Sequence, residues 1–134
     1  MPRIRTIKPS FWADEHVAEL TRDARLLAIG LISSADDDGR FIASIAAISG
    51  YVYPHDDLPP AKVKRWLTEI ELAGIVQLYT VHRREYGAFP NWEKHQRVNR
   101  PSESLIPPPP TGPSANGFTA RSVSPSVSDS LRKS

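Results

Sequence analysis

The stretch LPPAKVKRWLTEIELAGIVQLY, residues 58–79, predicts a helix that ends at a glycine and continues directly into a strand. Its apolar residues recur at helical spacing and form one stripe made of Val63, Trp66, Leu67 and Ile70. Pro59 and Pro60 suit the first turn, because the backbone N–H groups there have no partner within a helix. Gly74 can adopt the left-handed conformation that ends a helix. The β-rich residues that follow, as far as Val81, predict a strand.

The basic side chains of this helix gather in its amino-terminal half, off the apolar stripe. They are Lys62, Lys64 and Arg65, and Thr68 follows one turn later on the same side. The helix macrodipole disfavours a positive charge at this end by roughly 0.3–1 kcal/mol at low salt. A solvated face has no need of that arrangement, whereas a helix that presents its beginning to a polyanion does. Taken alone, these residues leave both interpretations open.

The composition favours one small domain without a metal site or a cofactor. The chain has 134 residues, with 17 basic and 15 acidic side chains, a net charge of +2 and no cysteine. Disulfides and thiolate zinc sites are therefore excluded. No apolar run approaches the ~20 residues of a membrane span, and no apolar signal segment follows the basic start. We expect a soluble, cytoplasmic protein with no membrane contact.

Upstream of residue 58 the pattern predicts two further helices with a short strand between them. Thr21 is expected to cap a helix that ends near Ser33. The buried stripe of that helix comprises Ala24, Leu27, Ala28 and Leu31. Arg40–Ile42 predicts the strand, and Ser44 is expected to cap a helix over residues 45–51. Together with the helix that begins near residue 60, this gives three helices.

The ends of the chain differ from this central part. Residues 1–10 form a basic arm without helical period, for which a solvated terminus and a DNA-contacting arm are equally consistent. A short helix is expected over residues 14–20, and Phe11 and Trp12 are expected to be the first core anchors. The domain is expected to span residues 11–100. Residues 101–134 are rich in proline and serine, which predicts a disordered tail.

After the strand that ends at Val81, a second β-rich run around a basic turn at residues 82–85 predicts a hairpin with Arg83 and Arg84 at its tip. Trp92 is then expected to pack back on the domain. Three helices, a strand between the first two and a hairpin after the third predict an α+β fold of the winged helix-turn-helix type. In that fold the third helix would be the recognition helix and the hairpin the wing.

The sequence shows no constellation that predicts catalysis. Asp36–Asp37–Asp38–Gly39 suggests a calcium loop, but in an EF-hand register the first and twelfth ligands would be Ser34 and Ile45, which do not fit. The four histidines are scattered, and no nucleophile is paired with a base. We therefore expect a protein that is not an enzyme and has no metal, no cofactor and no small-molecule substrate.

Five stretches of this pattern resemble a family of bacteriophage replication initiation proteins, or replisome organisers, with an amino-terminal winged-helix domain. The stretches are RIRTIKPSFW (3–12), LTRDARLLAIGL (20–31), ADDDGRF (35–41), LTEIELAGIV (67–76) and PNWEKHQRV (90–98). The first and the last are the more specific, and the pattern covers roughly residues 2–107. The resemblance implies DNA binding and replication initiation, with a helicase loader or another replisome protein as a further partner.

Three functional hypotheses follow. In the first, the protein acts in replication initiation by binding double-stranded DNA, with Arg65 and Thr68 at base edges. Phosphates would then be held by Lys62, Lys64, Arg83 and Arg84, and an adjacent minor groove by Arg3 and Arg5. The second hypothesis is a transcriptional regulator on the same fold. The third is a protein-interaction module, favoured by the acidic later part of helix three at Glu69 and Glu71.

Overall fold

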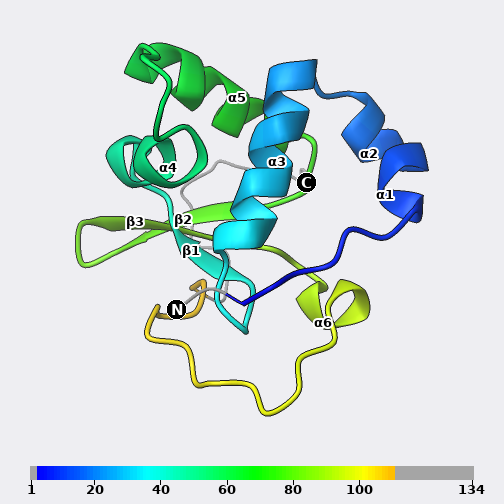
Figure 1. Cartoon of the computed structure of the whole chain (residues 1–134). Helices are drawn as coiled ribbons and strands as arrows, with labels where there is room; N and C mark the ends of the chain where they lie inside the picture. Colours follow the sequence, from blue (N-terminus) through cyan, green and yellow to red (C-terminus); the bar gives the residue numbers. More distant parts are fainter. Residues whose placement is uncertain (1–2, 111–134) are drawn as a thin grey trace.

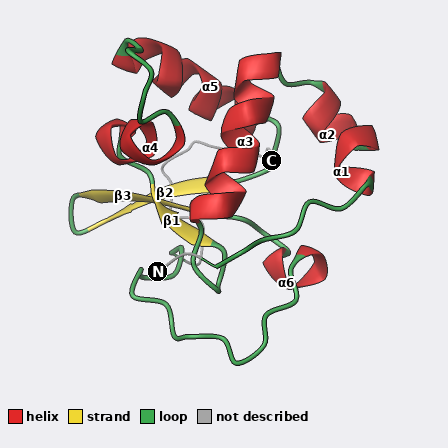
Figure 2. Ribbon diagram, in the orientation of Figure 1, coloured by secondary structure: helices red, strands yellow, loops and turns green. Residues whose placement is uncertain are grey.

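The computed structural model describes residues 3–110, and residues 1–2 and 111–134 lie outside this range. Within it the protein is α+β, with six helices and one three-stranded antiparallel sheet. In chain order the elements are α1 Ser10–Ala13, α2 Glu15–Ala18, α3 Arg22–Ser34, β1 Arg40–Ile42, α4 Ile45–Val52, α5 Pro60–Leu72, β2 Gln77–Val81, β3 Arg84–Ala88 and α6 Trp92–His95. Figures 1 and 2 show α3, α4 and α5 together on one side of the sheet. None of these helices combines the length and the apolar composition that a membrane crossing requires.

The three longer helices begin and end where local chemistry predicts. The hydroxyl oxygens of Thr21 and Ser44 accept backbone N–H bonds at the starts of α3 and α4, as expected. Helix α5 has Pro60 in its first turn. Its last residue is Leu72, and Gly74 follows the C-cap Ala73 with a left-handed φ of 80°. The N–H of Ile75 bonds the carbonyl of Ile70 at 3.2 Å. This closing bond is that of a Schellman motif, which turns the chain directly toward β2.

The sheet has the order β1-β3-β2, so the strand from between α3 and α4 pairs with the second strand of the hairpin. Phe41 pairs with Gly87, which in turn pairs with Leu78. A Cβ atom at Gly87 would lie 2.3 Å from the Phe41 ring, so this glycine lets the ring lie against the strand. Phe41 thereby reaches the core and is only 2% exposed.

The core lies between these helices and the sheet. Helix α3 packs against α4 and α5, which also contact each other. The largest fully buried side chains are Leu27, Leu31, Val63 and Ile70. Trp66 is half-buried and packs its ring 5.7 Å from that of Tyr53. The apolar stripe predicted for α5 is therefore confirmed, with Trp66 at its edge.

Two expectations about the first 20 residues are corrected. Trp12 is 59% exposed and is not a core anchor, while Phe11 is half-buried. Both belong to the single turn α1, in which neighbouring side chains point about 100° apart, so only one of them can face the protein. The helix expected over residues 14–20 is only one turn, α2, which follows the N-cap Asp14 and ends at Ala18.

The hairpin turn is tighter than expected. Val81 pairs with Arg84, so only His82 and Arg83 lie between the strands, with φ values of 50° and 67°. Two successive left-handed residues are the geometry of a type I′ turn. Arg83 therefore lies at the tip, whereas Arg84 is the first residue of β3.

The segment after α6 returns to the domain. The N–H of Ser102 bonds the Asp37 carboxylate at 2.8 Å, and the carbonyls of Ile106 and Pro107 accept bonds from Arg40 and Tyr79. Residues 101–110 were expected to begin a disordered tail, but residues 102–107 bond to the turn before β1 and to the sheet. The rest of that expected tail, residues 111–134, lies outside the described residues.

Candidate nucleic-acid interface

Helix α5 presents its basic side chains to solvent because its apolar residues face α3 and α4. Lys62, Lys64 and Arg65 are all exposed. None of these three side chains makes a hydrogen bond or an ion pair with another residue of the described range 3–110. Thr68 is also exposed, but its hydroxyl donates to the Lys64 carbonyl at 2.9 Å, within the helix. The three cations are therefore open to a ligand, whereas the Thr68 donor is already used.

The hairpin adds two more unpaired cations. Arg83 at the tip and Arg84 at the start of β3 are exposed, and in the described part of the chain neither side chain has a bonding partner. In Figure 1 the beginning of α5 and the tip of the β2–β3 hairpin both lie toward the left of the view, with α4 between them. Acidic neighbours along the chain are Asp57 before α5 and Glu85 in β3.

The basic arm is not free. The Arg5 guanidinium donates to the Asp37 carboxylate at 2.9 Å and to the Ala35 carbonyl at 2.9 Å, and it lies 5.2 Å from the centre of the Trp92 ring. The Arg5 side chain is only 4% exposed, so its expected role in a minor groove is wrong. A charge that follows an extended arm can be buried where the fold supplies a carboxylate and an aromatic face.

Arg3 is held by the same carboxylate and by the chain after α6. Its Nε atom lies 3.2 Å from the other Asp37 oxygen, and its Nη atoms donate to the carbonyls of Asn99 and Arg100. The backbone N–H of Ser102 is the largest influence that lowers the pKa of Asp37, and Arg5 and Arg3 lower it further, against the opposing effect of burial. Asp37 is thus the anchor of the arm, a role that sequence reasoning missed.

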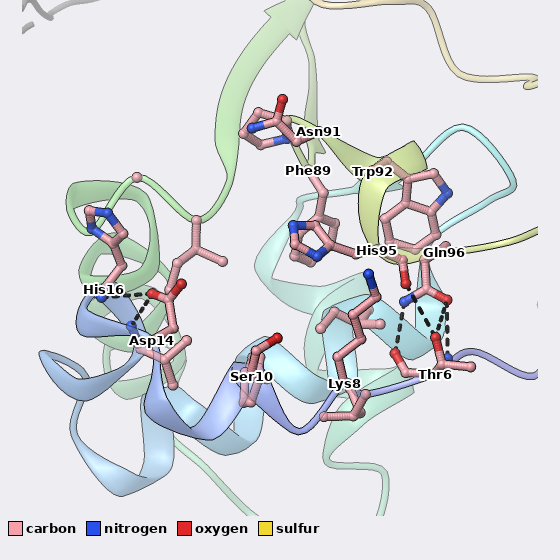
Figure 3. Close-up of a pocket in the computed structure, with 17 residues that line it drawn as sticks. Thr6, Lys8, Ser10, Asp14, His16, Phe89, Asn91, Trp92, His95 and Gln96 are labelled. Carbon is pink, nitrogen blue, oxygen red and sulfur yellow. Dashed lines mark hydrogen bonds between the residues drawn. The ribbon is translucent and has the colours of Figure 1, made fainter.

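Sequence reasoning also missed a cavity of about 240 Å³ on another part of the molecule. It lies between the arm, α1 and α2 on one side and α6 with the residues before it on the other, and Figure 3 shows its lining. Phe11, Phe89 and Trp92 contribute aromatic rings, and Lys8, Asp14 and His95 contribute polar groups. Most of its walls come from residues 3–12 and 90–98, the two stretches whose family resemblance is the more specific. That resemblance was the available signal for the cavity in the sequence.

Two further titratable side chains, Tyr79 and Asp36, have structural roles. Burial raises the pKa of Tyr79 to about 12, and its hydroxyl donates to the Pro107 carbonyl at 2.7 Å. One Asp36 oxygen accepts the N–H groups of Asp38 and Arg40, which forms the turn before β1. Within residues 3–110 no three His, Asp or Glu side chains lie close enough to hold a metal ion.

Compared with models of known protein families, with curated proteins and with solved structures, the chain matches none of them.

Proposed function

We propose that this protein binds double-stranded DNA through α5 and the β2–β3 hairpin, in the manner of a winged helix-turn-helix. The observation that supports this best is the set of five exposed cations, on two elements, that have no partner within residues 3–110. Unpaired lysines and arginines are what a phosphate backbone recruits. The element order α3, β1, α4, α5, β2, β3 and the sheet order β1-β3-β2 support the winged-helix arrangement.

The five side chains divide by position. Arg65 points away from the buried stripe in the second turn of α5, and its planar guanidinium can donate two bonds to the edge of guanine. Lys62 and Lys64 flank it and suit phosphates. Arg83 and Arg84 project from the hairpin toward the backbone beside the groove. Thr68 contributes at most an acceptor, since its proton is bound to the Lys64 carbonyl.

The resemblance to phage replication initiation proteins supports a place for this DNA binding at a replication origin, followed by contact with a helicase loader or another replisome protein. A transcriptional regulator would use the same interface. The position of the preferred DNA site, within an origin or upstream of a promoter, distinguishes these two roles.

A pure protein-interaction module is less well supported than DNA binding. That hypothesis depended on the acidic part of α5. The Glu69 carboxylate, however, accepts the backbone N–H and the hydroxyl of Thr21 at 2.9 and 3.0 Å. This residue thereby ties α5 to the beginning of α3 and is not presented to a partner.

The test compares two variants on two DNAs. Arg65→Ala should weaken binding to a site selected from random duplexes by about 1–3 kcal/mol, and weaken binding to unselected duplex much less. Arg83→Ala with Arg84→Ala should weaken both equally, because phosphate contacts are independent of sequence.

The matched control is Lys94→Ala with Arg97→Ala, which removes two exposed cations near α6. Binding by all variants would be measured by anisotropy at one salt concentration. If the control weakens duplex binding as much as the hairpin variant does, the proposed interface is wrong.

A further inference from the structure

We propose that the cavity between the arm, α2 and α6 binds one unpaired nucleotide of a DNA strand, a site separate from α5 and the hairpin. This proposal rests on the proposed function, since it extends nucleic-acid binding to a second surface. In Figure 1 the arm, α1, α2 and α6 lie at the right of the view, whereas the hairpin tip lies at the left.

The volume and the walls of the cavity suit a single base. Its volume of about 240 Å³ lies just below the range of roughly 300–1,000 Å³ for drug-sized ligands, which suits a single base better than a larger molecule. Phe11 and Phe89, both half-buried, line it from its two sides, and the buried Trp92 packs its ring 5.5 Å from that of Phe89. Aromatic side chains are the surfaces on which proteins stack unpaired bases.

Four of the polar side chains that line the cavity are not used by the fold. Asn91 and His95, together with Ser10 and His16, line the cavity, and within residues 3–110 their side chains make no hydrogen bond. Figure 3 shows these groups on opposite walls of the cavity. Hydrogen-bonding side chains held around an apolar pocket, without partners of their own, are what a ligand with a polar edge requires.

Charged side chains on two sides of the cavity would orient the bound nucleotide. The Lys8 ammonium donates a hydrogen bond to the Lys94 carbonyl at 2.7 Å. This bond holds a cation beside His95, in a position that suits a phosphate. Asp14 lies on the opposite wall, beside His16. One oxygen of its carboxylate accepts the N–H groups of His16 and Val17 at the start of α2, and the other oxygen is not bonded within the described chain. A carboxylate there repels a phosphate and accepts from a base that has an amino group, such as cytosine.

This arrangement predicts that a single strand of cytosines binds more tightly than one of thymines, whose base offers no amino group. Labelled cytosine and thymine octamers would be compared by anisotropy, and we expect about tenfold tighter binding of the cytosine strand. Asp14→Asn keeps a residue that caps a helix equally well but removes the charge, so the preference for cytosine should shrink.

The cation is tested with a matched control. Lys8→Ala should weaken binding of the cytosine octamer by several-fold, whereas Arg97→Ala, an exposed cation in the next segment that does not line the cavity, should weaken it less. Thermal unfolding of each variant, followed by circular dichroism, checks that it is folded. Cytidine monophosphate is measured beside the octamer, because a free nucleotide offers the same chemistry. If cytidine monophosphate binds as tightly as the octamer, the free nucleotide is the ligand.

Three results overturn the proposal, two of them from the variants. One is equal binding of cytosine and thymine strands in wild type and in Asp14→Asn. The other is an equal loss of affinity for the cytosine octamer in Lys8→Ala and Arg97→Ala, which would mean that the strand is attracted to basic charge in general. A protein that binds duplex but no single strand refutes this inference and leaves the proposed function in place. Failure to bind duplex refutes the proposed function.

Discussion

Among single residues, Asp37 connects the most distant parts of the sequence, because its carboxylate bonds both the arm and the segment after α6. It pairs with Arg3 and Arg5 and accepts the backbone N–H of Ser102. The side chains of Asp37 and Arg5 are 5% and 4% exposed. A buried pair of this kind is costly to break from one side, because the remaining charge is left without a partner.

Asp37→Asn should therefore lower the free energy of unfolding by about 3 kcal/mol at neutral pH. The folded protein lowers the pKa of Asp37, so its contribution is complete above the unfolded pKa of about 4 and is lost as the pH falls through the folded value. The difference in free energy of unfolding between wild type and variant, measured by urea unfolding, should narrow below about pH 4. Asp38→Asn, at an exposed neighbour, is the control. A gap that does not depend on pH would contradict this account.

Glycines give a second test at this scale. Gly87→Ala places a Cβ atom 2.3 Å from the Phe41 ring and should cost about 1–3 kcal/mol through overpacking. Gly50→Ala, in helix α4 with no atom within 4 Å of the new Cβ, should instead stabilise the protein by up to about 1 kcal/mol. Chemical denaturation measures both changes. Equal effects of the two substitutions would refute the placement of Phe41 against β3.

Among the elements, α5 combines a buried side and a basic side on one helix of 13 residues. Ile70→Ala should lower stability by about 2–5 kcal/mol, because Ile70 is fully buried. Leu72→Ala, two residues later and 82% exposed, should change stability by less than about 0.5 kcal/mol. Thermal melts of both variants test the orientation of the helix. If Leu72→Ala proved the more harmful, the helix would be rotated.

Elements set by local chemistry were predictable from the sequence, and elements set by distant partners were not. The end of α5 at Gly74 follows from a single residue that tolerates positive φ, and the caps at Thr21 and Ser44 follow from short-range bonds. The position of Arg5 depends on Asp37 and Trp92, 32 and 87 residues away in the chain, so no local pattern reveals it. The five cations were predictable because the helix and the hairpin that carry them have local sequence signals. The cavity was missed because it forms only where separate segments meet.

In the whole molecule, residues 99–107 bond the domain at three places: the Arg3 side chain, the turn before β1 and the sheet. A chain that ends at Val98 loses the bonds to Asp37, Arg40 and Tyr79 that a chain ending at Pro110 keeps. The shorter chain should therefore melt about 5 °C or more below the longer one. Tyr79→Phe in the longer chain removes one of these bonds and should cost only about 1 kcal/mol. Identical melting of the two chains would show that the segment adds nothing to stability.

If the five unpaired cations bind duplex DNA, the affinity must depend strongly on salt concentration. The measurement is the affinity for one duplex at several salt concentrations, for wild type and for Arg83→Ala with Arg84→Ala. If four or five cations neutralise phosphates, log K against log salt should have a slope of roughly −4, and the double variant should flatten it by up to about 2. A slope near zero, or the same slope in both proteins while both remain folded, would contradict the proposed interface.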